Sequence, residues 1–158
     1  MTMRIFKKIE NNELYLYMDG KLIYKRWLDT GQSKVFDVMA YDKYTLTSFR
    51  DWEYEGSREL ISIKAKLAMK KSEDGGRITG FTSGYRPNHV FEYKDNGHLL
   101  MTFIGDIIFE DQNTIEPGET KEVIVRFLLE QPIEKYLDKG RRWWIHERAR
   151  VVGEAVII

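Results

Sequence analysis

The stretch LYLYMDGKLIY, residues 14–24, predicts a β-hairpin. Asp19-Gly20 suits the positive φ angles of a two-residue type I′ turn, and the runs on either side carry the aliphatic and aromatic residues typical of strands. Further outward, residues 34–38 and 44–49 are polar at nearly every other position, which is the pattern of a strand with one buried face. Residues 1–59 are therefore expected to form a small antiparallel β-meander.

The remainder of the chain predicts five or six more strands separated by turn residues. They cover residues 61–69, 90–93, 99–109, 123–129, 142–145 and 151–157. Residues 51–59 are acidic and read as a connection, and only the short segment 133–137 suggests a helix. Many short strands at this spacing favour a sandwich or a small barrel, whose closure leaves no exposed strand edges. We therefore expect an all-β protein with the meander at 1–59 and a barrel domain at 60–158.

Composition excludes several classes of protein. The chain has 158 residues, with 25 Lys and Arg against 25 Asp and Glu, so its formal net charge is zero. A nonspecific DNA coat or a polybasic membrane binder needs an excess of positive charge, so neither DNA nor a membrane is an expected partner. The absence of cysteine removes disulfides, thiolate metal sites and a cysteine nucleophile. The N-terminus leads into no apolar segment, which favours a cytoplasmic protein.

The second part of the chain carries several motifs in a recognisable order. The motifs are GGRITGF at 75–81, GYRPN at 84–88, EPGE at 116–119, QPI at 131–133 and GRRWWIHERARVVG at 140–153. In this order they resemble segments of the third domain of elongation factor Tu, and the resemblance covers residues 60–158. Residues 1–59 show no such resemblance.

The resemblance implies a six-stranded antiparallel β-barrel that carries no catalysis of its own. In elongation factor Tu this domain packs against the other domains of the factor and contacts the T-stem of aminoacyl-tRNA. The nucleotide chemistry belongs to another domain, and this sequence contains neither a Gly-x4-Gly-Lys-Ser/Thr loop nor an Asn-Lys-x-Asp guanine-reading motif. GTP binding is therefore not expected, and no cofactor is implied.

The resemblance places tRNA-contacting positions at Asn88 and Glu147, while the glycines at the tip of the family's last hairpin fall on Arg148 and Ala149. Arginine and aromatic residues surround that tip, and such residues hold phosphates and stack on bases in RNA-binding proteins. The same residue types form the hot spots of protein interfaces. The candidate partner-binding or RNA-binding residues are Arg86, Asn88, Arg142, Trp143, His146, Glu147, Arg148 and Arg150.

These aromatic and basic residues also have a purely structural reading. Trp143 and Trp144 are adjacent in an expected strand and point to opposite faces, so at least one of them belongs to the core. Arg86 is held extended by Pro87 and can hydrogen-bond carboxylates or carbonyls within the barrel. The aromatic residues of the meander either pack onto the barrel or form a partner-binding patch. They are Tyr15, Tyr17, Tyr24, Trp27, Tyr41, Tyr44, Trp52 and Tyr54.

No set of residues predicts catalysis. The three histidines, His89, His98 and His146, lack metal-ligand spacing, and no serine stands in a Gly-x-Ser-x-Gly elbow. We expect no enzyme activity, no catalytic residue and no metal. The sequence favours a stand-alone, noncatalytic binding module similar to the elongation factor Tu third domain. It would engage a protein partner, as a translation-linked, decoy or immunity-type protein. The alternative is an RNA-binding accessory that contacts tRNA-like stems through the C-terminal basic hairpin.

Overall fold

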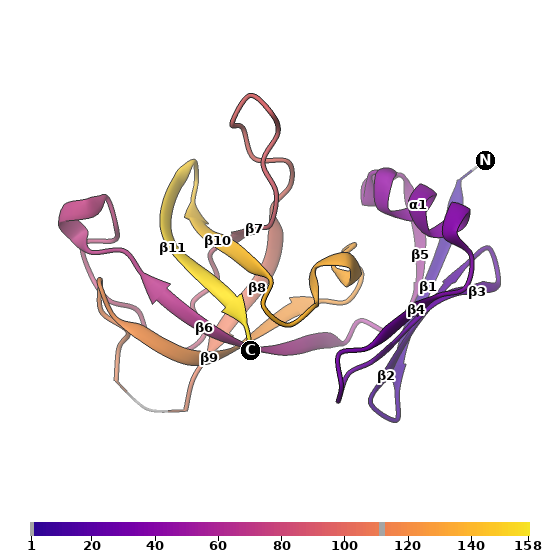
Figure 1. Ribbon diagram of the computed structural model, residues 1–158, viewed down its shortest axis with the longest axis horizontal. Helices are drawn as coiled ribbons and strands as arrows, with labels where there is room; N and C mark the ends of the chain where they lie inside the picture. Colours follow the sequence, from indigo (N-terminus) through magenta and orange to yellow (C-terminus); the bar gives the residue numbers. More distant parts are fainter. Residues whose placement is uncertain (1, 111–112) are drawn as a thin grey trace. The chain divides into compact units, whose positions relative to one another are not determined.

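The computed structural model describes residues 2–110 and 113–158, and strands are its main regular elements (Figure 1). The chain forms two compact units. The first contains Met1–Leu60 together with Leu128–Asp138, and the second contains Ile61–Phe127 and Lys139–Ile158. The expected all-β class is confirmed. The segment Leu128–Asp138 had been expected within the barrel, and it packs with the first unit.

The first unit is a five-stranded sheet with the order β4-β3-β2-β1-β5. Its strands are β1 (Met3–Glu10), β2 (Glu13–Met18), β3 (Lys21–Trp27), β4 (Ser33–Val35) and β5 (Trp52–Gly56). The hairpin predicted from Asp19-Gly20 is present, with φ angles of 49° and 84° at these two residues. The sheet is mixed, however, because β5 runs parallel to β1. The expectation of a purely antiparallel meander, with a plain connection at 51–59, was wrong.

Helix α1 (Val38–Leu46) ends within the segment 44–49, for which a strand was predicted. Asp37 caps the helix, because its side chain accepts a hydrogen bond from the amide of Ala40 at 3.0 Å. Helical spacing then turns Tyr41 and Tyr44 to the same side, where Tyr44 stacks on Trp52 with ring centroids 4.5 Å apart. A one-turn 3-10 helix, Phe49–Asp51, follows. The alternation read as a strand belongs to a helix with a single buried residue.

A buried polar cluster holds Leu128–Asp138 in the first unit. The Lys7 side chain is fully buried, and its Nζ donates to the carbonyl oxygens of Leu129 at 2.8 Å and Gln131 at 2.6 Å. The same ammonium pairs with Glu134 Oε1 at 2.5 Å, and the Tyr44 hydroxyl donates to Glu134 Oε2 at 2.6 Å. Glu134 lies in a short 3-10 helix, Glu134–Tyr136, the only trace of the helix expected at 133–137. Each buried charge thus has a partner, as burial requires.

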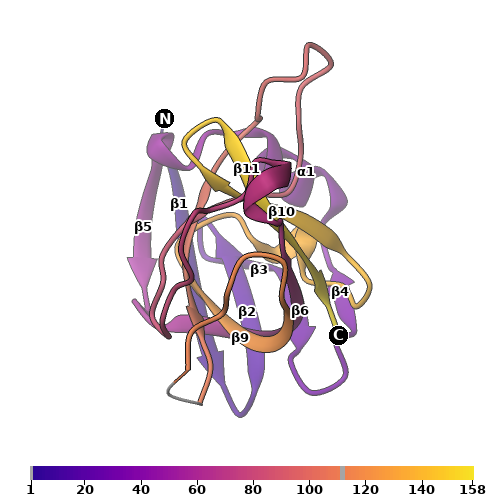
Figure 2. The ribbon, with the colours of Figure 1, turned by 90° about the vertical axis from the view of Figure 1, so that its left-hand side faces the viewer.

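The second unit is a closed barrel with the strand order β10-β11-β6-β9-β8-β7. Its strands are β6 (Leu60–Met69), β7 (Asn88–Val90), β8 (Phe103–Ile108), β9 (Thr120–Leu128), β10 (Arg142–Glu147) and β11 (Arg150–Ile157). The predicted six-stranded antiparallel barrel is confirmed. Strands β7 and β8 are shorter than expected, and the loop 91–102 between them projects from the barrel (Figures 1 and 2). A 3-10 turn, Ser72–Asp74, follows β6.

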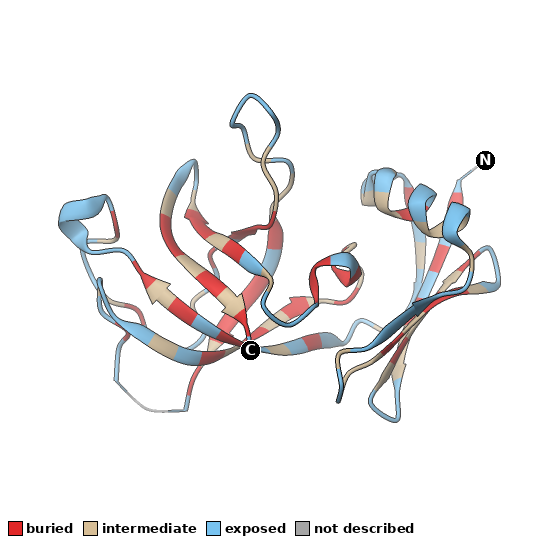
Figure 3. Ribbon diagram, viewed as in Figure 1, coloured by how far each residue is buried: buried red, intermediate tan, exposed pale blue. Residues whose placement is uncertain are grey.

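The barrel interior is filled by aromatic side chains around one histidine. Buried and accessible residues alternate along the barrel strands, as Figure 3 shows. Trp143 Nε1 donates to His89 Nδ1 at 3.0 Å, and His89 Nε2 lies 2.9 Å from the carbonyl oxygen of Gly105. Because an indole nitrogen can only donate, His89 must carry its single proton on Nε2 and be neutral. Burial lowers the pKa of His89 to about 4.

Candidate binding surface on the barrel

The β10–β11 hairpin gathers most of the predicted site residues at one end of the barrel. Asn88 of β7 lies opposite His146, and Glu147 lies opposite Arg150. The turn between the two strands contains Arg148, whose φ of 56° lies in the left-handed region. This is the position at which the resembling family carries glycine. Asn88, Arg148 and Arg150 are exposed there.

Arg142 does not belong to this group, although the sequence places it in the same basic cluster. It begins β10 and pairs with Val156 at the far end of the hairpin. At about 3.3 Å per residue, a strand separates Arg142 from Arg148 by roughly 20 Å. The predicted basic cluster is therefore split between the two ends of one hairpin.

Two predicted site residues are not on the surface. Trp143 is fully buried, and His146 is 2 % exposed beneath the hydroxyl of Tyr93, which lies 2.5 Å from its Nε2. Neither side chain can reach a partner, so the proposal that they bind one is corrected. The sequence argument that the adjacent tryptophans face opposite ways is confirmed, since Trp144 is half-buried on the outer wall. Of the two tryptophans, Trp144 is the accessible one, so the prediction that Trp143 binds a partner was wrong.

Glu147 is half-buried and forms an ion pair with another side chain of the barrel. Arg77 Nη1 donates to both carboxylate oxygens of Glu147, at 2.7 and 2.8 Å. The Arg77 guanidinium also lies over the Tyr85 ring, 4.8 Å from its centroid. A partner that used Glu147 would have to compete with Arg77. Arg77 was not among the predicted site residues, although it lies in the GGRITGF motif.

Arg86 is exposed near an ion pair on the barrel wall. Arg126 donates to both carboxylate oxygens of Asp106, at 2.9 and 2.6 Å. This pairing holds the pKa of Asp106 below its ordinary value, and the charge of Arg86 contributes in the same direction. Arg86 thus takes part in the electrostatics of the barrel and keeps an exposed side chain.

A hollow of about 420 Å³ lies on the outer wall of the barrel, over β6, β11 and β10. Trp144, Glu154 and Ala68 lie side by side across these three strands. Tyr93, from the projecting loop, packs edge-on against Trp144 with ring centroids 5.2 Å apart. The remaining lining residues are Met69, Lys70, Val151 and Gly153.

Strand β11 packs tightly against β6 at Gly153, which lines the hollow. The register between β10 and β11 shifts at Ile145 and His146, which marks a bulge. At Gly153 an added Cβ would lie 2.8 Å from Met69 Sδ and 3.0 Å from the carbonyl oxygen of Ala68. A larger residue would therefore disturb the wall between β11 and β6.

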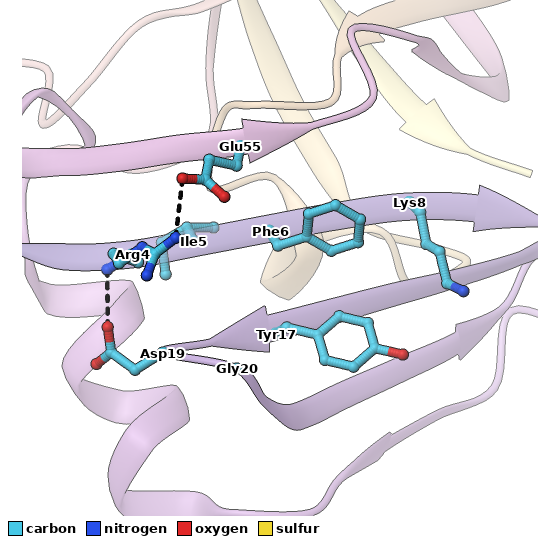
Figure 4. Close-up of a pocket in the computed structure, with 8 residues that line it drawn as sticks. All are labelled: Arg4, Ile5, Phe6, Lys8, Tyr17, Asp19, Gly20 and Glu55. Atoms are coloured by element: carbon cyan, nitrogen blue, oxygen red, sulfur yellow. Dashed lines mark hydrogen bonds and ion pairs between the residues drawn. The ribbon is translucent and has the colours of Figure 1, made fainter.

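A second hollow, of about 330 Å³, lies on the outer face of the first unit's sheet (Figure 4). Phe6 and Tyr17 form its apolar part, edge to face, with centroids 5.6 Å apart. Arg4 Nη2 donates to Glu55 at 3.0 Å, and Lys8 pairs with Glu10 at 2.9 Å. The charged side chains on this face form ion pairs with one another, so few of their charges are available to bind a charged ligand.

Tyr24, Tyr44 and Trp52 lie in the core of the first unit itself, which accounts for part of its high aromatic content.

Within residues 2–110 and 113–158, no group of three or more His, Asp or Glu side chains is arranged to hold a metal ion. None of the helices formed by these residues is long and apolar enough to cross a membrane. The chain matches no protein-family model. The closed six-stranded barrel is consistent with the fold that the motif resemblance implies.

Proposed function

We propose that this protein is a noncatalytic binding module that engages a protein partner through the outer wall of its barrel. The observation that supports this is the hollow over β6, β11 and β10, where Trp144 and Tyr93 present aromatic surface beside Lys70 and Glu154. Aromatic anchors in a concave site with a polar surround are typical of protein-binding hot spots. The hollow of about 420 Å³ has room for one or two partner side chains.

The motif resemblance suggests which process the partner belongs to. A domain similar to the third domain of elongation factor Tu would present surfaces like those of that factor. It would act as a translation-linked, decoy or immunity-type protein, meeting its partner in the cytoplasm. At the hairpin tip Arg148 has a left-handed backbone conformation, and Glu147 is paired with Arg77. The tip therefore differs from a glycine tip, which lets RNA approach the backbone.

The alternative function is that of an RNA-binding accessory. Exposed Asn88, Arg148 and Arg150 lie together at one end of the barrel, which favours a contact with the phosphates of a tRNA-like stem. Such binding would weaken steeply with salt and with the replacement of Arg148 and Arg150 by alanine.

The test compares variants in an affinity capture from a lysate of the native host, treated with RNase. A protein retained by the wild type and by Phe6→Ala, but lost with Trp144→Ala and Tyr93→Ala, supports binding through the barrel wall. Phe6 is a matched control because it is an aromatic residue, 39 % exposed, lining the hollow of the other unit. Retention that RNase abolishes and that depends on Arg148 would support the RNA alternative. A retained protein that is indifferent to Trp144 would contradict the proposed surface.

A further inference from the structure

We propose that the barrel wall binds an extended acidic peptide segment that carries one bulky apolar side chain. This inference rests on the proposed function and specifies the chemistry of its partner. The apolar side chain would enter the hollow beside Trp144, and the acidic side chains would lie on the basic residues that border it.

The wall around the hollow is basic. Lys64 and Lys66 face outward from β6, and exposed Lys70 follows directly after the end of that strand. Arg142 lies in the same row as Lys66, with Val156 between them. Among residues 2–110 and 113–158, none of these four cations has an ion pair. Four unpaired cations thus face solvent on a chain whose formal net charge is zero. Such a local excess selects a negatively charged ligand.

Two carboxylates lie among these cations. Glu154 stands in the row between Trp144 and Ala68, and Glu122 faces outward from the neighbouring strand β9. The wall therefore keeps a positive excess and carries one negative charge, that of Glu154, in the lining of the hollow. A ligand must place negative groups on the lysines and a neutral or hydrogen-donating group at Glu154.

An extended peptide has the spacing that this arrangement needs. Side chains on one face of a strand recur about every 6.6 Å, the distance that also separates Lys64 from Lys66 along β6. Ala68 follows with the hollow above it, and Lys70 comes next. A peptide lying along β6 would match this series with the pattern acid-x-acid-x-apolar-x-acid.

A polynucleotide fits the wall less well. It carries a phosphate on every nucleotide, so it cannot leave the position of Glu154 uncharged, whereas a peptide can offer a backbone N–H there. Trp144 and Tyr93 also meet edge to face, at an interplanar angle of 65°, so they present no pair of parallel faces between which a base would stack. The observations favour the acidic peptide.

The experiment measures fluorescence anisotropy of labelled peptides with the full chain. The probes are DSDSFSD and its reverse DSFSDSD, with KSKSFSK as the charge control and DSDSGSD as the anchor control. We expect one of the two probes to bind wild-type protein saturably below about 1 mM, and about tenfold more tightly than either control. Binding should weaken as salt rises from about 50 mM to about 500 mM, because its charge contacts are exposed.

Three variants localise the binding. Lys66→Glu with Lys70→Glu is expected to weaken it about tenfold or more, as is Trp144→Ala. Lys43→Glu, an exposed charge reversal on α1, is the matched control and should leave the affinity unchanged. The Lys66→Glu, Lys70→Glu variant changes only exposed side chains and is expected to fold. It therefore still tests the proposal if Trp144→Ala does not fold.

The outcomes separate this inference from the function on which it rests. Binding of a twelve-nucleotide oligouridylate through Lys66 and Lys70, without binding of the peptides, would overturn the acidic peptide and assign the wall to nucleic acid. If neither probe binds while a lysate protein is still retained through Trp144, the partner chemistry is wrong and the protein-binding function stands. If no protein is retained and no probe binds, both proposals fail.

Discussion

Lowering the pH from about 7 to about 5 is expected to destabilise the barrel through one buried histidine. His89 is fully buried, accepts a hydrogen bond from Trp143 Nε1 and donates one to the carbonyl oxygen of Gly105. Protonation would break the first bond and leave a charge in the barrel interior. Burial accordingly lowers the pKa of His89 from 6.5 to about 4.

The size of the effect follows from the two pKa values. Below pH 6.5 the unfolded chain binds a proton at this histidine, and the folded barrel does not until about pH 4. The unfolded state therefore holds more protons in this window, so the free energy of unfolding falls as the pH falls. At about 1.4 kcal/mol per pH unit the loss is about 2 kcal/mol by pH 5 and about 3 kcal/mol by pH 4. Burial also lowers the pKa of His146, which acts in the same direction.

Urea titrations followed by NMR would measure this loss separately in the two units. The amide signals of Ile107 and Val125 report on the barrel, and those of Leu14 and Leu16 report on the first unit, which contains no histidine. The barrel signals should lose stability between pH 7 and pH 5, and the signals of the first unit should show no histidine-linked loss.

A His89→Gln variant is the control, since an amide can accept from Trp143 and donate to Gly105 without titrating. It is expected to cost about 1 kcal/mol at neutral pH and to remove most of the slope between pH 7 and pH 5. The reasoning would be refuted by a wild-type barrel equally stable at both pH values, or by a variant whose slope equals that of the wild type.

Three further outcomes are expected. Lys7→Met should lower the free energy of unfolding of the first unit by about 3–5 kcal/mol in urea titrations, because Glu134 loses its buried counterion; a loss below about 1 kcal/mol would show that the pair is not buried in solution. Trp143→Ala should destabilise the barrel by about 3–5 kcal/mol and Trp144→Ala by much less, and the reverse order in thermal melts would mean that the register of β10 is wrong. Gly153→Ala should cost about 1–3 kcal/mol, since its Cβ would press on the Met69 sulfur; unchanged stability would contradict that close approach.

Local pattern was sufficient for much of this fold. The Asp19-Gly20 hairpin, the strands of the barrel and the opposite faces of Trp143 and Trp144 all follow from a period of two and from turn residues. Local pattern failed at α1, where Asp37 is an N-cap signal and Tyr41 and Tyr44 are three residues apart. Both helical signals are present in the sequence, but the strand at 44–49 was predicted from the alternation alone.

The candidate site was harder to predict, because it depends on which strands become neighbours. Nothing in β6 or β11 alone indicates that Ala68 and Glu154 lie beside Trp144, and the hollow arises only from that registry. The split of the basic cluster has the same origin. Residues six apart are close in a sequence and roughly 20 Å apart on an extended strand.

Local periodicity and motifs were enough to predict the β class, the barrel strands, the leading hairpin and the lack of a phosphate-binding loop. Three pairings could not be predicted from local pattern: β5 runs parallel to β1, Lys7 pairs with Glu134 although 127 positions separate them, and Arg77 pairs with Glu147. These pairings depend on burial and long-range register. A buried charge needs a partner of opposite charge, which can lie far away along the chain. The residues next to it in the sequence do not indicate which residue that partner is.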